Sequence, residues 1–199
     1  MKIKICGIAS EREAETAVSE GADLLGFVFT PGPRRLDLAL ARYIVRNLPS
    51  AVTPVGVFRN QPLDEVRSLL EGSGVRMAQL NGAESPEFAG ALGVEVIKTF
   101  TQFTRRSLED LSRYDSFACL ADAGSRGAVD AGWASCAKKF ASVLISAPGD
   151  FGALHDLIHR VRPWGVDATG MKESDRLRSL VGAVRAAEHD TQKIRITIR

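Results

Sequence analysis

The feature that most constrains the fold is an eightfold alternation of short apolar runs, rich in Val, Ile and Phe, with longer stretches of helical periodicity. Eight such units are typical of a single parallel (β/α)8 (TIM) barrel. An open doubly wound sheet is the competing fold, but the turn after the first run, Cys-Gly-Ile-Ala-Ser, lacks a Gly-rich fingerprint. The runs predict strands at 2–6, 24–29, 53–58, 76–80, 94–98, 116–122, 142–146 and 165–167, and the stretches between them predict helices at 10–20, 38–47, 63–71, 86–92, 104–113, 131–139, 151–160 and 174–188.

Composition bounds the class of protein. The 199 residues are 45% hydrophobic and 25% charged with a net charge of +2, which predicts one barrel domain over 1–199. No block of like charge points to nucleic acid, and no apolar run reaches the roughly 18 residues of a membrane span. Without a secretion signal or a CxxC pair, the three cysteines predict reduced thiols in a cytoplasm. Residues 190–199 are expected to form an extra edge strand or a flexible tail.

The C-terminal ends of barrel strands are where such folds place their chemistry. Cys6 ends the first run, and we interpret it as a general base or nucleophile, with a buried structural cysteine as the alternative. As a base it would need a site that favours the thiolate, which nearby positive charge would provide. Asp122 ends the sixth run, where a functional carboxylate and a helix cap are equally plausible readings.

Other strand ends carry candidate binding groups. Arg34 and Arg35 follow the second run, and one of them is a candidate for holding an anion, with a solvated basic loop as the alternative. The turns at 146–149 and 167–170 follow the last two runs, where barrels often bind phosphate. His155 and His159 are four residues apart, and we interpret them as a solvated helix face rather than a metal site.

Several segments together resemble the phosphoribosylanthranilate isomerase family, in the family's order and over residues 4 to about 185. Lys-Ile-Cys-Gly at 4–7 and Gly-Ala-Asp-Leu-Leu-Gly-Phe-Val-Phe at 21–29 are similar to its first two strands. The remaining matches are Pro31 to Arg35, Val-Gly-Val-Phe at 55–58, Gln-Leu-Asn-Gly at 79–82, Val-Ile-Lys at 96–98, Leu-Ala-Asp at 120–122 and Trp133.

The resemblance implies an Amadori rearrangement of N-(5-phosphoribosyl)anthranilate in tryptophan biosynthesis, with Cys6 as base, Asp122 as acid and no metal or organic cofactor. It implies that Arg35 holds the anthranilate carboxylate. It further implies a small-molecule phosphosugar–anthranilate partner, and the chain is expected to be a monomer or homodimer. The remaining substrate-binding positions that we assign are Gln79, Asn81, Lys98, Ser146, Gly149, Thr169 and Gly170.

The chain departs from the family pattern around the phosphate. Pro148 stands in the turn at 146–149, where the family has Ala-Gly-Gly, and proline cannot donate an N–H. After the eighth strand, Thr169 and Gly170 run almost directly into Met-Lys-Glu at 171–173, so part of the phosphate loop is missing. Arg126 or Lys172 would compensate by binding an anion directly.

Three hypotheses follow. The first is a working phosphoribosylanthranilate isomerase with a shortened phosphate loop. The second is a relative in secondary metabolism that uses the Cys6/Asp122 pair on another sugar conjugate or in C–C bond formation. The third is a non-enzymatic barrel, which retention of both Cys6 and Asp122 disfavours.

Overall fold

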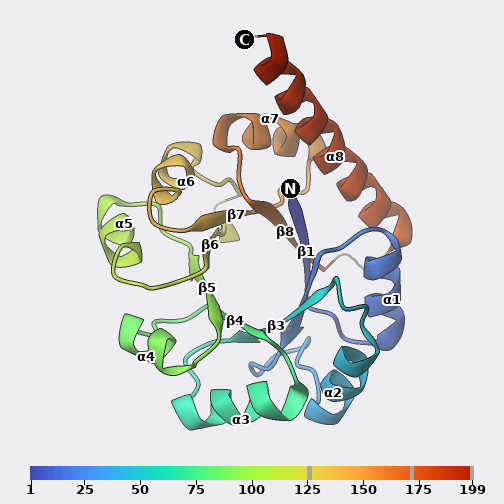
Figure 1. Ribbon diagram of the computed structural model, residues 1–199, viewed down its shortest axis with the longest axis vertical. Coiled ribbons are helices and arrows are strands. Elements are labelled where there is room, and N and C mark those ends of the chain that lie inside the picture. Colours follow the sequence, from blue (N-terminus) through green and yellow to red (C-terminus); the bar gives the residue numbers. More distant parts are fainter. Residues whose placement is uncertain (125–126, 171–172, 198–199) are drawn as a thin grey trace.

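The computed structural model is a closed barrel of eight parallel strands, hydrogen-bonded in chain order and wrapped by helices (Figure 1). It describes residues 1–124, 127–170 and 173–197, with side chains as far as residue 190. The strands are β1 (Lys2–Cys6), β2 (Leu24–Val28), β3 (Thr53–Phe58), β4 (Met77–Leu80), β5 (Glu95–Phe100), β6 (Ala118–Ala121), β7 (Ser142–Ser146) and β8 (Gly165–Thr169). The helices are α1 (Glu11–Ser19), α2 (Leu38–Asn47), α3 (Leu63–Ser73), α4 (Pro86–Ala91), α5 (Arg105–Leu111), α6 (Ala131–Ala137), α7 (Phe151–Val161) and α8 (Ser174–Thr197).

Every predicted strand and helix has its counterpart, and the predicted barrel is confirmed. Local sequence explains where several helices begin. The side chains of Ser10, Asp37 and Ser85 each accept a hydrogen bond from a backbone N–H in the first turn of α1, α2 and α4. A cap of this kind satisfies donors that would otherwise lack a partner, so the chain turns from loop to helix at a defined residue.

The largest correction concerns the end of the chain. The extra edge strand expected within 190–199 is wrong as far as Thr197, because α8 continues through that residue, and the alternative of a flexible tail stays a prediction. Once a helix has formed, each added residue gains a hydrogen bond, which favours extension over a new strand. None of the helices that the structure describes is long and apolar enough to cross a membrane.

Alternation along the strands separates two apolar clusters. Residues such as Ile3, Ile5 and Phe27 face outward and pack against the helices. The alternate residues of the strands face the barrel axis. There a smaller apolar cluster fills the interior: Leu24, Val55, Met77, Ile97, Ala118, Leu120 and Leu144. Because successive side chains on a strand point to opposite faces, Lys4 and Cys6 on β1 share the inward face. The inner cluster thus supports a polar layer toward the C-terminal ends of the strands.

Cys119 lies on the outward face of β6, as expected for a core residue, and is fully buried. Burial raises the pKa of its thiol from 9.0 to about 12. The unfolded chain releases this proton near pH 9 and the folded chain only near 12, so the unfolded state binds fewer protons in between. The contribution to stability is therefore complete below pH 9 and is lost as the pH rises above it.

We therefore predict that the wild-type protein loses about 2 kcal/mol relative to Cys119→Ala between pH 8 and pH 10.5. Urea unfolding of both proteins at the two pH values measures the difference, and titration of the groups that they share cancels. A gap between the two proteins that does not change with pH would show that Cys119 is not shielded from water.

Candidate active site at the barrel mouth

The inward face of the strands becomes polar toward their C-terminal ends. Lys4, Gln79 and Asp167 are buried there although each is polar or charged. Pairing of β1 with β8 places Lys4 beside Asp167 and Cys6 beside Thr169. Residues 163 positions apart in the sequence are thus neighbours because the barrel closes between its first and last strands.

An ion pair anchors this layer. The Lys4 ammonium donates to Asp167 Oδ1 over 2.6 Å, and neither side chain is more than 5% exposed. Burial alone would lower the pKa of Lys4, but the Asp167 carboxylate, with a smaller contribution from Cys6, outweighs it and raises that pKa. The pair is therefore charged, and removing either partner leaves a buried, uncompensated charge.

Cys6 lies at the end of β1 with 7% of its surface exposed. Burial is the main cause that raises the pKa of its thiol above the usual 9.0, and the Asp167 carboxylate adds to it. The Lys4 ammonium opposes this rise, as do side-chain hydrogen bonds from Lys4 and Thr169. The positive charge beside Cys6 therefore does not by itself favour the thiolate, because the Lys4 ammonium is already paired with the Asp167 carboxylate.

Gly26 makes room for this arrangement. It pairs with Cys6 across β1 and β2. A Cβ atom at Gly26 would lie 2.9 Å from Cys6 Sγ, closer than real Cβ contacts, and 3.1 Å from Lys4 Nζ, which is tighter than most of them. Only glycine leaves both groups in place, so this glycine in the second strand is explained by close approach rather than by backbone conformation.

Asp122 follows β6 and is half-buried at the mouth. Its Oδ1 atom accepts a hydrogen bond from Gly124 N over 3.1 Å, which fixes the start of the loop. The hydroxyl of Ser146 at the end of β7 accepts from Ala123 N over 2.9 Å, so it supports the backbone next to Asp122. Asp122 shares the inward parity of Leu120 and does not cap α6, which begins after Asp130.

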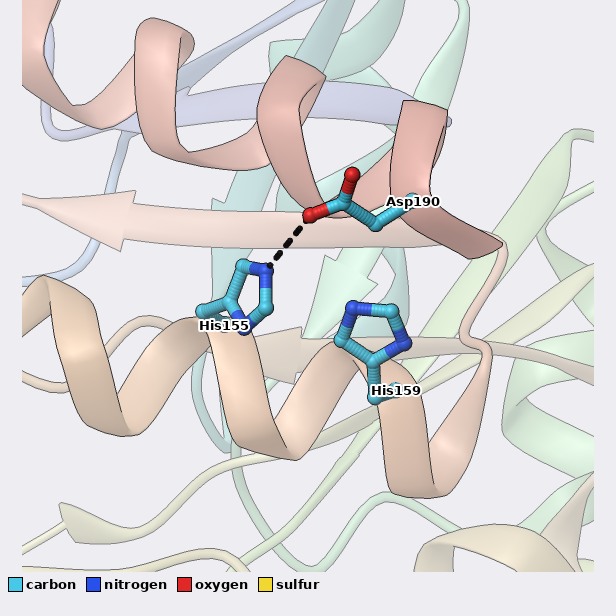
Figure 2. Close-up of side chains that lie close together, drawn as sticks. All are labelled: His155, His159 and Asp190. Carbon is cyan, nitrogen blue, oxygen red and sulfur yellow. Dashed lines mark hydrogen bonds and ion pairs between the residues drawn. The ribbon is translucent and has the colours of Figure 1, made fainter. Parts of the chain in front are cut away.

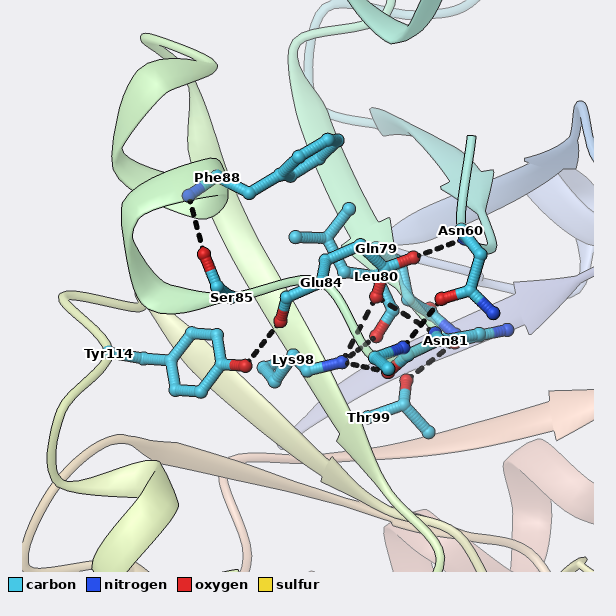
Figure 3. Close-up of polar contacts among 12 residues, drawn as sticks. Asn60, Gln79, Leu80, Asn81, Glu84, Ser85, Phe88, Lys98, Thr99 and Tyr114 are labelled. Atoms are coloured by element: carbon cyan, nitrogen blue, oxygen red, sulfur yellow. Dashed lines mark hydrogen bonds and ion pairs between the residues drawn. The ribbon is translucent and has the colours of Figure 1, made fainter. Parts of the chain in front are cut away.

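A second polar group lies at the ends of β4 and β5 (Figure 3). Asn81 Oδ1 accepts from Gln79 Nε2 over 2.9 Å and from Thr99 Oγ1 over 2.6 Å. Gln79 Oε1 is buried and accepts no hydrogen bond from any residue that the structure describes. A buried acceptor without a donor is costly, so this atom is a position where a ligand hydroxyl would bind favourably.

Lys98 does not belong to this polar group of Gln79, Asn81 and Thr99. It has the outward parity of Val96 on β5, and its ammonium donates to Gly82 O over 2.6 Å and to Glu84 Oε2 over 3.1 Å. Glu84 in turn accepts from Asn60 N over 2.7 Å (Figure 3). These bonds fasten the loops after β3 and β4 to β5, so we assign Lys98 to holding the site together rather than to binding substrate.

The two arginines after β2 have different surroundings. Arg34 donates to Gly7 O and to Glu13 Oε2, the latter over 2.7 Å, and so folds its loop over the residue that follows Cys6. Arg35 is exposed, and its side chain makes no hydrogen bond within the described part of the chain. Of these two arginines, Arg35 is thus the one without a hydrogen-bond partner among the described residues, and its role in binding the substrate stays a prediction.

The predicted phosphate turns lie at the ends of β7 and β8. Gly149 and Gly170 are both exposed, and a Cβ atom at either would meet nothing within 4 Å. Thr169 is exposed beside Cys6 and precedes Gly170, which has a φ of +74°. Arg126 and Lys172, the two cations expected to compensate for the altered turns, lie outside the described residues.

Sequence reasoning missed Lys4 as a member of the site, and it placed Asp167 in the phosphate turn at 167–170 without recognising it as the partner of Lys4. The alternation in Lys-Ile-Lys-Ile-Cys carried the signal, because an inward Cys6 requires an inward Lys4 two residues earlier. A lysine inside a barrel needs a carboxylate, and Asp167 ends the run predicted for the last strand. Thr99, Glu84 and Asn60 were missed because their roles depend on contacts between loops.

A family model for N-(5'-phosphoribosyl)anthranilate (PRA) isomerase matches residues 3–139, more than half of the chain. The chain belongs to this family. Curated PRA isomerases support the assignment over the full length. The protein from Desulforudis audaxviator is 36% identical over 200 residues, which cover 93% of this chain and 98% of the relative. The protein from Geotalea daltonii is 36% identical over 89% of this chain and 90% of its own.

Solved PRA isomerase structures share the fold. The enzyme from Thermus thermophilus superimposes with a TM-score of 0.82 at 34% identity, covering 94% of this chain and 99% of its own. The enzyme from Thermotoga maritima gives 0.85 at 27% identity with the same coverage. A PRA isomerase in complex with reduced 1-(o-carboxyphenylamino)-1-deoxyribulose 5-phosphate gives 0.82 at 26% identity, again covering 94% and 99%. The predicted family, barrel and isomerase function are confirmed.

The ion pair beneath Cys6 yields a test with a matched control on the same face of β1. Lys4→Met leaves the buried Asp167 carboxylate without a positive partner and should lower the free energy of unfolding by about 3–5 kcal/mol. Lys2 pairs with Asp23 over 2.9 Å but is 47% exposed, so Lys2→Met should cost less than about 1 kcal/mol. Urea unfolding measures both, and equal losses would contradict the buried, charged state of the Lys4–Asp167 pair.

Proposed function

We propose that this PRA isomerase converts N-(5-phosphoribosyl)anthranilate to 1-(carboxyphenylamino)-1-deoxyribulose 5-phosphate in tryptophan biosynthesis, with Cys6 as general base and Asp122 as general acid. The observation that carries the proposal is their placement. Cys6 ends β1 and Asp122 follows β6, which is three strands away from β1 around the closed ring through β7 and β8, and both carry inward parity. A substrate held in the mouth is then flanked by an acid and a base.

The rearrangement needs two proton transfers. Asp122 gives its proton to the furanose ring oxygen, the C1–O bond breaks, and the nitrogen lone pair forms a Schiff base at C1. Cys6 removes the proton from C2, and the C2–H electrons form the enolamine. Tautomerisation of the enolamine to the C2 ketone completes the reaction. In this step Asp122 regains a proton and Cys6 gives up the proton that it took, so both groups return to their starting states. Each group contributes roughly 10²–10⁴-fold to the rate.

The state of Cys6 fits a base that is activated only with substrate. Burial and Asp167 raise the pKa of the thiol, which favours its neutral form. Ring opening creates a cationic Schiff base next to Sγ, and a positive charge within a few ångströms lowers the pKa of a thiol. The Lys4 ammonium adds to the same effect. The thiolate is therefore favoured at the step that needs it.

Other groups would bind the two ends of the substrate. The exposed Arg35 guanidinium matches the planar anthranilate carboxylate. A ribose hydroxyl would donate to the unsatisfied Gln79 Oε1 atom, with Asn81 beside it. The open turns at Gly149 and Gly170, with Ser146 and Thr169, would hold the phosphate.

The setting of the enzyme completes the proposal. We place this reaction in the cytoplasm, in one barrel domain over 1–199. The chain works as a monomer or homodimer, and one solved PRA isomerase from Thermotoga maritima is described as dimeric.

The two catalytic roles predict the kinetics of two variants. Cys6→Ala and Asp122→Asn should each lower kcat/KM for N-(5-phosphoribosyl)anthranilate by roughly 10²–10⁴-fold and fail to restore growth of a tryptophan auxotroph that lacks this isomerase. Cys136→Ala is the matched control, because Cys136 is an exposed cysteine outside the barrel mouth and should behave as wild type. Folded wild-type protein without activity would favour another sugar conjugate or a non-enzymatic barrel, and an active Cys6→Ala would remove the assigned base.

Arg35 should act on binding. Arg35→Leu removes the guanidinium that pairs with the carboxylate, so KM should rise by roughly tenfold or more while kcat changes little. Arg46→Leu, which removes an exposed guanidinium from the last turn of α2, is the control and should leave both parameters unchanged. A lower kcat at unchanged KM in Arg35→Leu would mean that the residue serves the chemical step instead.

A further inference from the structure

Two histidines and an aspartate meet on the outside of the barrel, at the edge where α7 packs against α8 (Figure 2). His155 and His159 are four residues apart on α7, and Asp190 projects toward them from α8. One ligand atom from each residue lies within 4.8 Å of the others. This reading goes beyond the solvated helix face that the sequence indicated, because the third member comes from a helix that sequence spacing does not place nearby.

We propose that His155, His159 and Asp190 form a divalent transition-metal site, best suited to Zn²⁺, that fastens α8 to α7. Two histidines at i and i+4 present their rings on one helix face and act as a chelating pair. A carboxylate oxygen is the third ligand, and two imidazoles with one carboxylate is a ligand set that zinc accepts. Imidazole nitrogen selects zinc, copper or nickel over magnesium and calcium.

The present geometry requires only small rotations of side chains. His155 Nε2 lies 3.4 Å from Asp190 Oδ2, and the centroids of the two imidazole rings are 4.5 Å apart. Ligand atoms around a tetrahedral zinc are about 3.4 Å apart, given bonds of about 2.1 Å. The His155–Asp190 separation already matches this spacing. Both histidines are half-buried and Asp190 is exposed, so a fourth position facing solvent is available to water.

The position of the site gives it a structural consequence. Five residues before Asp190, α8 contacts the residue that precedes β1, because Arg185 Nη1 donates to Met1 O over 2.8 Å. Further back, the apolar face of α8 buries Leu180 and Val184. A metal bridging Asp190 to α7 would therefore add a second attachment of the C-terminal part of α8 to the barrel, besides the contact of Arg185 with Met1. Binding to the folded chain alone stabilises it by mass action.

The test uses the full-length, tag-free protein carrying Cys136→Ser, so that the exposed thiol does not bind zinc. Isothermal titration with Zn²⁺ should show one site per chain and a zinc-dependent rise in the melting temperature, with no response to Mg²⁺. His155→Asn, His159→Asn and Asp190→Asn should each weaken zinc binding by roughly tenfold or more and abolish the rise in melting temperature. His189→Asn, a neighbouring histidine on α8 outside the cluster, is the matched control and should bind zinc as the parent does.

The proposal fails if the parent protein does not bind Zn²⁺ at micromolar concentration. It also fails if the His155 and His159 variants bind as tightly as the parent, or if loss of His189 alone removes the site. All these variants change side chains that are not fully buried on the outside of the barrel, so their folding, checked by circular dichroism, is expected to be unaffected.

Discussion

The buried ion pair between Lys4 and Asp167 is the interaction on which the rest of the site depends. It joins the first strand to the last and places a positive charge directly beneath Cys6. Because both side chains are buried, removing either one leaves the other as a buried, uncompensated charge, which lowers the stability of the fold. Because Gly26 has no side chain, it leaves space for this pair and for the thiol. One interaction thus serves both closure of the barrel and the chemistry of the mouth.

The two faces of each strand divide the work of the protein. Inward residues form an apolar layer and, toward the C-terminal ends of the strands, the polar groups of the proposed substrate site. Outward residues pack against helices, and the charged Lys98 among them holds a loop in place through its ion pair with the loop residue Glu84. Burial lowers the pKa of Lys98 while Glu84 opposes that effect, so this pair resembles the Lys4–Asp167 pair in its construction but not in its location. It positions Asn81 and Gln79 without facing the mouth.

Much of the fold was predictable from the sequence because its signals are local. Apolar runs, caps such as Ser10 and Asp37, and the order of the elements all act within a few residues. Cys6 and Asp122 became candidates because strand ends are recognisable in the sequence, whereas the choice of Arg35 over Arg34 came from the family resemblance, and all three roles stay predictions. What failed depends on contacts far apart in the chain. Lys4 and Asp167 lie 163 positions apart.

Two misreadings have physical causes of their own. Lys98 was misread because strands buried on both faces, such as the one containing Val96 and Ile97, do not reveal which side is inward. The alternation of basic and apolar residues in 193–199 is typical of a strand, yet residues 193–197 belong to α8, which continues through Thr197.

The most direct measurement is the pKa of Cys6 in the wild type and in Asp167→Asn, from the pH dependence of Cys6 alkylation read by peptide mapping of folded protein. In the wild type Asp167 raises the pKa of Cys6 and forms the ion pair with the Lys4 ammonium. The account predicts a wild-type pKa above 9.0 and a lower value in the variant, because a neutral asparagine leaves the charge of Lys4 to the thiolate. An unchanged or higher pKa in Asp167→Asn would contradict the claim that this ion pair controls the catalytic thiol.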